Sequence, residues 1–191
     1  MSKSDRERWN RKYSAGEGPA HFRPKAFLLG HADLLMGERA LDVACGFGGN
    51  ALYLASRGYR VDAVDVSEVG LAQAQREARQ RGLQHKIQFI QADMDRWWVP
   101  MARYDLVLVF FYLNRGLMPR LAKALRPGGL LFQANRNERF LQARPGFDAG
   151  YLLEVGELQQ LALDAGLEVA YFTEGTPEAD WDARLIARAP R

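Results

Sequence analysis

The chain has almost no cysteine and no long apolar segment. Cys45 is the only cysteine in 191 residues, so an internal disulfide is impossible and a metal site built from clustered thiols is excluded. No apolar run approaches the roughly 20 residues that a membrane span needs. The first ten residues, MSKSDRERWN, lack the apolar stretch of a secretory signal. We therefore expect a cytoplasmic protein with no metal site and no membrane partner.

A strong charge of one sign is also missing. The net charge is only +3, whereas a domain that grips a nucleic-acid backbone usually carries a larger and more localised basic excess. We therefore do not expect a nucleic-acid partner. The basic residues concentrate between Leu113 and Arg144, where Glu138 is the single acid. This segment is either solvated surface or an electropositive rim that attracts an anionic small molecule.

Length and composition suit one folded domain. The chain is 48% hydrophobic and 26% charged, which is typical of globular proteins, and its length is short for two domains. We expect a single domain over residues 1–191, made of an N-terminal helical cover (1–37) and a Rossmann-like core (38–191). The oligomeric state stays open between monomer and dimer.

Strand and helix patterns alternate along the core. This alternation predicts an α/β fold with a seven-stranded, mostly parallel, Rossmann-like sheet and helices on both faces. Only about seven residues, 174–180, separate the last two expected strands, and a parallel crossover needs about a dozen. The last strand must therefore run antiparallel. The strands are expected at 40–44, 59–64, 87–90, 104–112, 130–135, 167–173 and 182–188, and the helices of the core at 50–56, 68–81, from 119 to the Pro-Gly-Gly at 127–129, and 157–165.

A glycine-rich turn follows the first expected strand. Residues Gly46-Phe47-Gly48-Gly49 lie at its carboxyl end, where open α/β sheets bind ligands, and glycine lets a ligand approach the backbone closely. Asp65 ends the next strand, 19 positions after Gly46, where a carboxylate can accept hydrogen bonds from both hydroxyls of a ribose. The alternative is that Asp65 only caps the next helix, a role that we assign to Ser67. The pattern predicts a nucleotide-like cofactor.

Two acids and the last strand bear on which cofactor binds. The glycine turn also fits the dinucleotide pattern, so NAD is an alternative. Asp42, however, precedes the glycines where it would attract a charged amino group and repel a pyrophosphate. Asp93 follows the third strand and could accept the exocyclic amine of an adenine while Met94 packs against the ring. These residues argue against NAD, and so does the antiparallel last strand, which is unusual in a dinucleotide-binding sheet.

The successive segments LDVACGFGGN, VDAVDVS, QADM and LRPGGLL resemble, in order and spacing, the motifs of class I S-adenosylmethionine-dependent methyltransferases. The Trp9-Asn10-x-x-Tyr13 opening and residues 153–158 resemble the small tellurite-resistance and thiopurine methyltransferase branch. The resemblance implies methyl transfer from S-adenosylmethionine, with S-adenosylhomocysteine as product. It also implies cofactor contacts at Trp9, Tyr13, Asp42, Ala44, Cys45, Gly46, Gly48, Asn50, Asp65, Val66, Asp93, Met94 and Phe110, with Trp9 and Tyr13 closing over the cofactor.

The sequence limits the identity of the methyl acceptor mainly through the residues that it lacks. The transferred methyl is already electrophilic, so the enzyme's main task is to orient an acceptor. His21, His31 and Asp148 are weak candidates for a general base, so no catalytic residue is assigned. We expect a small molecule that reacts without strong deprotonation, such as a thiol, a chalcogen or an amine. Candidates for its pocket are Tyr112, Asn114, Arg136 and Arg139. The alternatives are an NAD-dependent oxidoreductase and a non-catalytic S-adenosylmethionine-binding protein.

Overall fold

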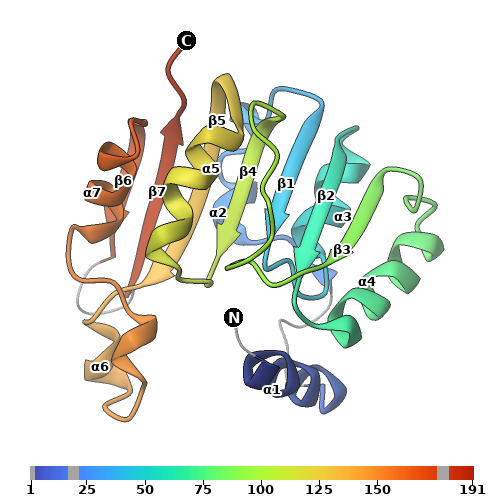
Figure 1. Cartoon of the computed structure of the whole chain (residues 1–191), viewed down its shortest axis with the longest axis horizontal. Helices are drawn as coiled ribbons and strands as arrows, with labels where there is room; N and C mark the ends of the chain where they lie inside the picture. The colour runs from blue at the N-terminus through green and yellow to red at the C-terminus, as the bar shows by residue number, and fades with distance from the viewer. Residues whose placement is uncertain (1–2, 17–21, 176–180) are drawn as a thin grey trace. The chain divides into compact units, whose positions relative to one another are not determined.

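The computed structural model describes residues 3–16, 22–175 and 181–191. Strands and helices alternate along the chain, as the sequence predicts (Figure 1). The strands are β1 (Arg39–Val43), β2 (Arg60–Asp65), β3 (Ile87–Gln91), β4 (Tyr104–Phe110), β5 (Leu125–Arg136), β6 (Glu168–Glu174) and β7 (Asp182–Arg188). The helices are α1 (Lys3–Ser14), α2 (Ala26–Leu29), α3 (Gly49–Ser56), α4 (Glu68–Gln80), α5 (Met118–Ala124), α6 (Phe140–Ala143) and α7 (Glu157–Asp164), with short 3-10 turns η2 (Ala32–Leu34), η3 (Arg115–Leu117) and η4 (Ala149–Tyr151).

The strands form one seven-stranded sheet in the order β3-β2-β1-β4-β5-β7-β6. β1 pairs in parallel with β2, and β2 with β3. β7 is antiparallel to both of its neighbours, β5 and β6. The predicted α/β class and the antiparallel last strand are therefore confirmed.

The chain divides into two compact units. The first holds residues 1–98 with 104–106, and the second holds residues 99–103 with 107–191. The single domain expected over 1–191, with its cover at 1–37 and core at 38–191, stays a prediction. Within the described parts of the chain, no helix is both long and apolar enough to cross a membrane.

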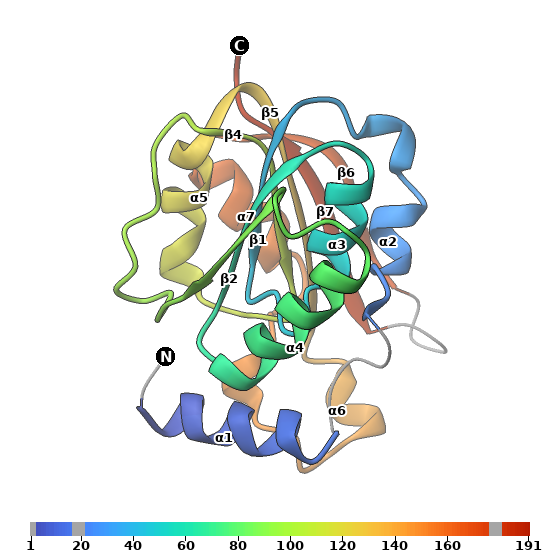
Figure 2. The same ribbon diagram turned by 90° about the vertical axis from the view of Figure 1, so that its right-hand side faces the viewer.

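The first unit is built on β1, β2 and β3 with α3 and α4. The helix α4 buries Gly70, Leu71, Ala74 and Ala78, a spacing of one, three and four residues that places them on one helical face. Ser67 caps this helix as predicted, because its Oγ accepts a hydrogen bond from the Gly70 N–H (3.1 Å). The helix α1 packs beside α4 (Figure 2).

The second unit contains β5, β6 and β7, and one predicted boundary in it is wrong. We expected the Pro-Gly-Gly at 127–129 to end a helix, with a strand from Leu130. Instead α5 ends at Ala124 and β5 begins at Leu125. A proline disfavours the helical region for the residue before it, and Gly128 at φ 76° donates its N–H to the Ala189 carbonyl (3.0 Å). The Pro-Gly-Gly therefore lies inside the strand.

Candidate cofactor site and acceptor region

The chain leaves β1 through a left-handed turn. Ala44, Gly46 and Gly48 have φ values of 53°, 55° and 70°. Glycine adopts such values freely, whereas alanine does so at an energetic cost. The Gly48 N–H donates to the Cys45 carbonyl (2.8 Å) and closes the turn before α3 begins. A non-glycine residue held at positive φ beside a strand end is typical of a functional turn.

Asp65 holds this turn from the end of β2. Its side chain is buried (4% exposed). One oxygen accepts the Gly46 N–H (2.8 Å) and the other accepts the Ser67 N–H (2.9 Å). The backbone N–H of Val66 also hydrogen-bonds to this carboxylate, and a carboxylate has about four acceptor sites, so it can still accept a ribose hydroxyl. The helix-capping alternative thus accounts for only one of the two oxygens.

Asp42 is the second buried acid of the turn (1% exposed). Its carboxylate accepts the Ala51 N–H (3.1 Å), and the Asn50 side chain also hydrogen-bonds to it. Burial, with a smaller contribution from the charge of Asp65, raises the pKa of Asp42 to about 7. Burial also raises the pKa of Asp65. Because both ionised forms are poorly stabilised, a cationic ligand would be favoured beside them.

Two aromatic side chains of α1 lie at the same turn. The Tyr13 hydroxyl lies 2.9 Å from the position that a Cβ on Gly46 would take, and its ring lies 3.0 Å from that position on Gly70. The Tyr13 ring centroid is 4.6 Å from that of Phe47 and 5.5 Å from that of Trp9. Burial, and then the charge of Asp65, raise the pKa of Tyr13. The structure places Trp9 and Tyr13 beside the glycine turn.

A polar network that the sequence did not reveal ties α1 to α4. Asn10 accepts a hydrogen bond from the Ser67 hydroxyl (2.6 Å) and donates to the Glu68 carboxylate (2.7 Å). Gln91 donates to the other Glu68 oxygen (2.9 Å). The only signal in the sequence was the place of Asn10 within the Trp9-Asn10-x-x-Tyr13 opening. This network positions Trp9 and Tyr13.

The segment after residue 21 also contributes unforeseen contacts. The Lys25 N–H donates to the Asn50 side chain (2.9 Å). A Cβ on Gly49 would overlap the backbone of Arg23, which explains why glycine stands there. A small hollow beside the turn is lined by Phe22, Arg23, Lys25, Cys45, Phe47, Gly49 and Asn50.

The predicted adenine contacts follow β3. The Asp93 carboxylate accepts the N–H of Asp95 (2.9 Å), and Met94 is fully buried. The Ala92 N–H donates to the Asp65 carbonyl (3.0 Å), so this segment starts directly beside the end of β2. The first unit therefore brings together twelve of the predicted cofactor residues, namely Trp9, Tyr13, Asp42, Ala44, Cys45, Gly46, Gly48, Asn50, Asp65, Val66, Asp93 and Met94.

Cys45 is buried, and the described candidate bases, His31 and Asp148, lie close to backbone groups of their own segments. Burial raises the pKa of the Cys45 thiol, which makes it a poor nucleophile. His31 lies with Nδ1 3.0 Å from the Phe27 carbonyl. Asp148 accepts the Gly150 N–H (2.9 Å) within a turn. His21 lies outside the described residues.

The remaining predicted residues lie in the second unit. Phe110 ends β4, and Phe111 follows at φ 58°, which the extended strand cannot continue. The strand expected to reach Tyr112 is therefore two residues shorter. The acceptor candidates Tyr112, Asn114, Arg136 and Arg139 all belong to this unit.

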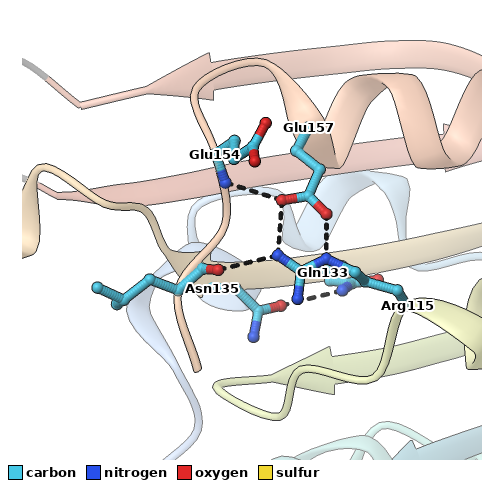
Figure 3. Close-up of polar contacts among 6 residues, drawn as sticks. Arg115, Gln133, Asn135, Glu154 and Glu157 are labelled. Atoms are coloured by element: carbon cyan, nitrogen blue, oxygen red, sulfur yellow. Dashed lines mark hydrogen bonds and ion pairs between the residues drawn. The ribbon is translucent and has the colours of Figure 1, made fainter. Parts of the chain in front are cut away.

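Arg115, beside those candidates, joins two segments of the second unit (Figure 3). Its guanidinium forms an ion pair with Glu157 at the start of α7 and donates to the Leu152 carbonyl (3.0 Å). Glu157 also accepts the Glu154 N–H (2.7 Å). The pair raises the pKa of Arg115 and lowers that of Glu157. The Arg115–Glu157 pair thereby fastens η3, which directly follows Asn114, to α7.

The end of β5 is polar on one side and aromatic on the other. The buried Gln133 side chain donates to Asn135 (2.9 Å; Figure 3). The guanidinium carbon of Arg136 lies 4.1 Å from the ring centroid of Phe140, and 5.8 Å from those of Phe111 and Phe147. Such distances are typical of cation–π contacts.

Comparisons with known proteins agree with this geometry. Residues 40–129 match the methyltransferase domain family. The ubiquinone biosynthesis O-methyltransferase of Idiomarina loihiensis is 34% identical over 116 residues, which are 58% of this chain and 47% of that protein. The enzyme of the same name from Azoarcus is 29% identical over 160 residues, 73% of this chain and 68% of that protein. The chain's match thus spans about half the length of the first relative.

Solved structures show the same fold. An S-adenosylmethionine-dependent methyltransferase from Mesorhizobium loti aligns with a TM-score of 0.69 and 21% identity, covering 85% of this chain and 98% of the other. The geranyl diphosphate C-methyltransferase of Streptomyces coelicolor, solved with S-adenosylhomocysteine, aligns with a TM-score of 0.68 and 16% identity, covering 86% and 77%. The tellurite-resistance and thiopurine branch stays a prediction. Residues 40–129 therefore resemble the methyltransferase domain family, and the chain has the fold of the aligned S-adenosylmethionine-dependent methyltransferases.

Proposed function

We propose that the protein transfers the methyl group of S-adenosylmethionine to a small-molecule acceptor. The main observation is the pair of buried acids, Asp42 and Asp65, at the ends of neighbouring strands beside the glycine turn. A ligand with an ammonium and a sulfonium charge would stabilise their ionised forms. A dinucleotide would instead bring a negatively charged pyrophosphate to the same acids.

The residues of the first unit suggest how the cofactor is held. Asp42 would accept the amino group and Asp65 the ribose hydroxyls. Asp93 and Met94 would contact the adenine, and Tyr13 would cover the turn. The same site would be lined by Ala44, Cys45, Gly46, Gly48, Asn50 and Val66, and Trp9 would complete the cover. Phe110 belongs to the second unit, and its contact with the methionine end stays a prediction.

The cofactor, when bound, supplies a methyl group on a cationic sulfur. The protein then has to hold an acceptor lone pair in line behind that carbon and exclude water, which is a matter of proximity and orientation. The described candidate bases, His31 and Asp148, hydrogen-bond locally instead. We therefore keep the prediction of an acceptor that needs no strong base, such as a thiol, a chalcogen or an amine.

A test of acceptors should include oxygen nucleophiles as well as thiols, chalcogens and amines. Both ubiquinone biosynthesis relatives are named O-methyltransferases, and a third relative is named malonyl-[acyl-carrier protein] O-methyltransferase. A carboxylate is ionised at neutral pH, so its methylation also needs no strong base. We keep the predictions of a cytoplasmic location and of a partner that is neither membrane nor nucleic acid.

An acceptor screen with radiolabelled S-adenosylmethionine tests the proposal. Matched panels of thiols, chalcogenides, amines, phenols and carboxylates are offered to the protein, and transferred label is counted. Transfer to a small molecule that fails in the Asp65→Asn variant and persists in Asp33→Asn, an exposed acid in η2, supports the proposal. Binding without transfer to any class would favour the non-catalytic alternative.

A further inference from the structure

One buried amide joins the glycine-turn region to the segment after residue 21. Asn50, the second residue of α3, is 8% exposed. Its Oδ1 accepts the backbone N–H of Lys25 (2.9 Å), and its side chain also hydrogen-bonds to the Asp42 carboxylate. All three residues belong to the first unit. Asn50 therefore links residues 22–25 to the acid that precedes the glycine turn.

These two contacts fix which way the Asn50 amide faces. An amide side chain has an acceptor oxygen at one end and a donor NH2 group at the other. Because the Lys25 backbone N–H can only donate, it takes the oxygen, and the Nδ2 group is left for Asp42. An ionised carboxylate accepts hydrogen bonds and cannot donate them. The amide is thus oriented to stabilise the charged form of Asp42.

The groups around Asp42 act on its charge in opposite directions. Burial is the largest influence and raises the pKa of Asp42, and the charge of Asp65 at the end of β2 also raises it. The Asn50 hydrogen bond is the largest opposing influence, the positive charge of Lys25 is a smaller one, and the pKa that results is about 7. Cys45 also interacts with Asp42, but burial raises the pKa of its thiol. The charge on Asp42 near neutral pH therefore depends strongly on Asn50.

We propose that Asn50 is a positioning residue for the cofactor: it orients Asp42 and donates a hydrogen bond to it, so that Asp42 accepts the amino group of S-adenosylmethionine. This inference rests on the proposed function. Asn50 then acts through Asp42, in addition to lining the site, and its influence is greatest on ligands that carry an amino group.

Two ligands that differ in this amino group test the role. S-adenosylhomocysteine carries it, whereas methylthioadenosine keeps the nucleoside and lacks the amino-acid portion. Calorimetry near pH 6.5 compares the wild type with Asn50→Ala. A pKa raised by about one unit lowers the ionised fraction of Asp42 by up to about tenfold. Affinity for S-adenosylhomocysteine should therefore fall by about fivefold or more, and affinity for methylthioadenosine by less than about twofold. Equal losses for both ligands would overturn the proposal.

The pH dependence of binding separates this role from lost packing. Asn50→Asp keeps an oxygen for the Lys25 N–H and places a second acid beside Asp42, so the two acids should share a proton near neutral pH. As the pH is lowered, S-adenosylhomocysteine affinity should begin to fall about one pH unit earlier than in the wild type. Gln80→Glu adds the same charge at an exposed position of α4 and should leave the profile unchanged. Coincident profiles of Asn50→Asp and the wild type would contradict the role of Asn50.

A measurement without ligand keeps this proposal distinct from the proposed function. Carbon NMR of protein with labelled aspartate follows the ionisation of Asp42, and the Asp42→Asn variant identifies its signal. The midpoint should rise by about one pH unit in Asn50→Ala and in Asn50→Asp, and an unchanged midpoint would overturn the proposal. If the midpoint rose while the wild type bound no S-adenosylhomocysteine, the Asn50–Asp42 contact would stand and the proposed function would fall. Asn50→Asp preserves the side-chain size, so it remains informative if Asn50→Ala misfolds.

Discussion

At the scale of single residues, the main feature is the pair of buried acids, Asp42 and Asp65. Both carboxyl groups are removed from water at strand ends, and backbone N–H groups only partly offset the cost of ionising them. A cationic ligand would lower that cost. Cofactor binding and the protonation of Asp42 should therefore be linked near neutral pH.

This linkage gives a pH dependence of stability. The pKa of Asp42 is 3.8 ordinarily and about 7 in the folded protein, so the folded state binds the extra proton. The stability from this group is full below the ordinary pKa and is lost as the pH rises through the folded value. Melting temperatures of the cofactor-free protein from pH 5 to 8 should fall more steeply for the wild type than for Asp42→Asn. Parallel curves would contradict the raised pKa.

The ribose assignment of Asp65 is tested by one substitution. Asp65→Asn replaces a charged acceptor of ribose hydroxyls with a neutral amide, and hydrogen bonds to charged groups are worth about 1.5–3 kcal/mol. We expect S-adenosylhomocysteine affinity to fall by more than about tenfold by calorimetry. Asp33→Asn is the control for loss of a negative charge. Unchanged affinity in Asp65→Asn would show that the ribose lies elsewhere.

At the scale of elements, the start of α3 depends on a close backbone approach. A Cβ on Gly49 would overlap the Arg23 carbonyl, so Gly49→Ala must push the 22–25 segment away. Overpacking of this kind costs about 1–3 kcal/mol, and we expect a lower melting temperature and weaker S-adenosylhomocysteine binding. Gly146→Ala is the matched control, because a Cβ there meets nothing within 4 Å. Equal melting temperatures of the two variants would refute the close approach.

In the second unit, the Arg115–Glu157 ion pair joins two elements, η3 and α7. Because the Arg115 side chain is 45% exposed, solvent screens the pair, and a double-mutant cycle with Arg115→Gln and Glu157→Gln should give a coupling of at most about 1 kcal/mol. The coupling should shrink further at about 1 M salt. Denaturant unfolding of the four proteins measures it, and a larger, salt-independent coupling would contradict this assignment.

At the scale of the whole molecule, the sequence predicted those features that depend on short stretches of the chain. Hydrophobic periodicity and the short 174–180 connection led to the sheet and its antiparallel last strand, and Ser67 could be recognised as a cap from its position. The predicted start of β5 was wrong because Pro127 and Gly128 are typical of turns, whereas here Gly128 and Gly129 form backbone hydrogen bonds with Ala189. The contacts of Asn10, Arg23 and Arg115 could not be predicted, since each joins segments far apart in the sequence.

Calorimetric titration of the protein with S-adenosylhomocysteine and, separately, with NAD is the most direct test of the central claim. The buried acids beside the glycine turn predict a one-to-one complex with S-adenosylhomocysteine and no measurable heat from NAD. Binding of NAD without binding of S-adenosylhomocysteine would contradict the assignment of the site.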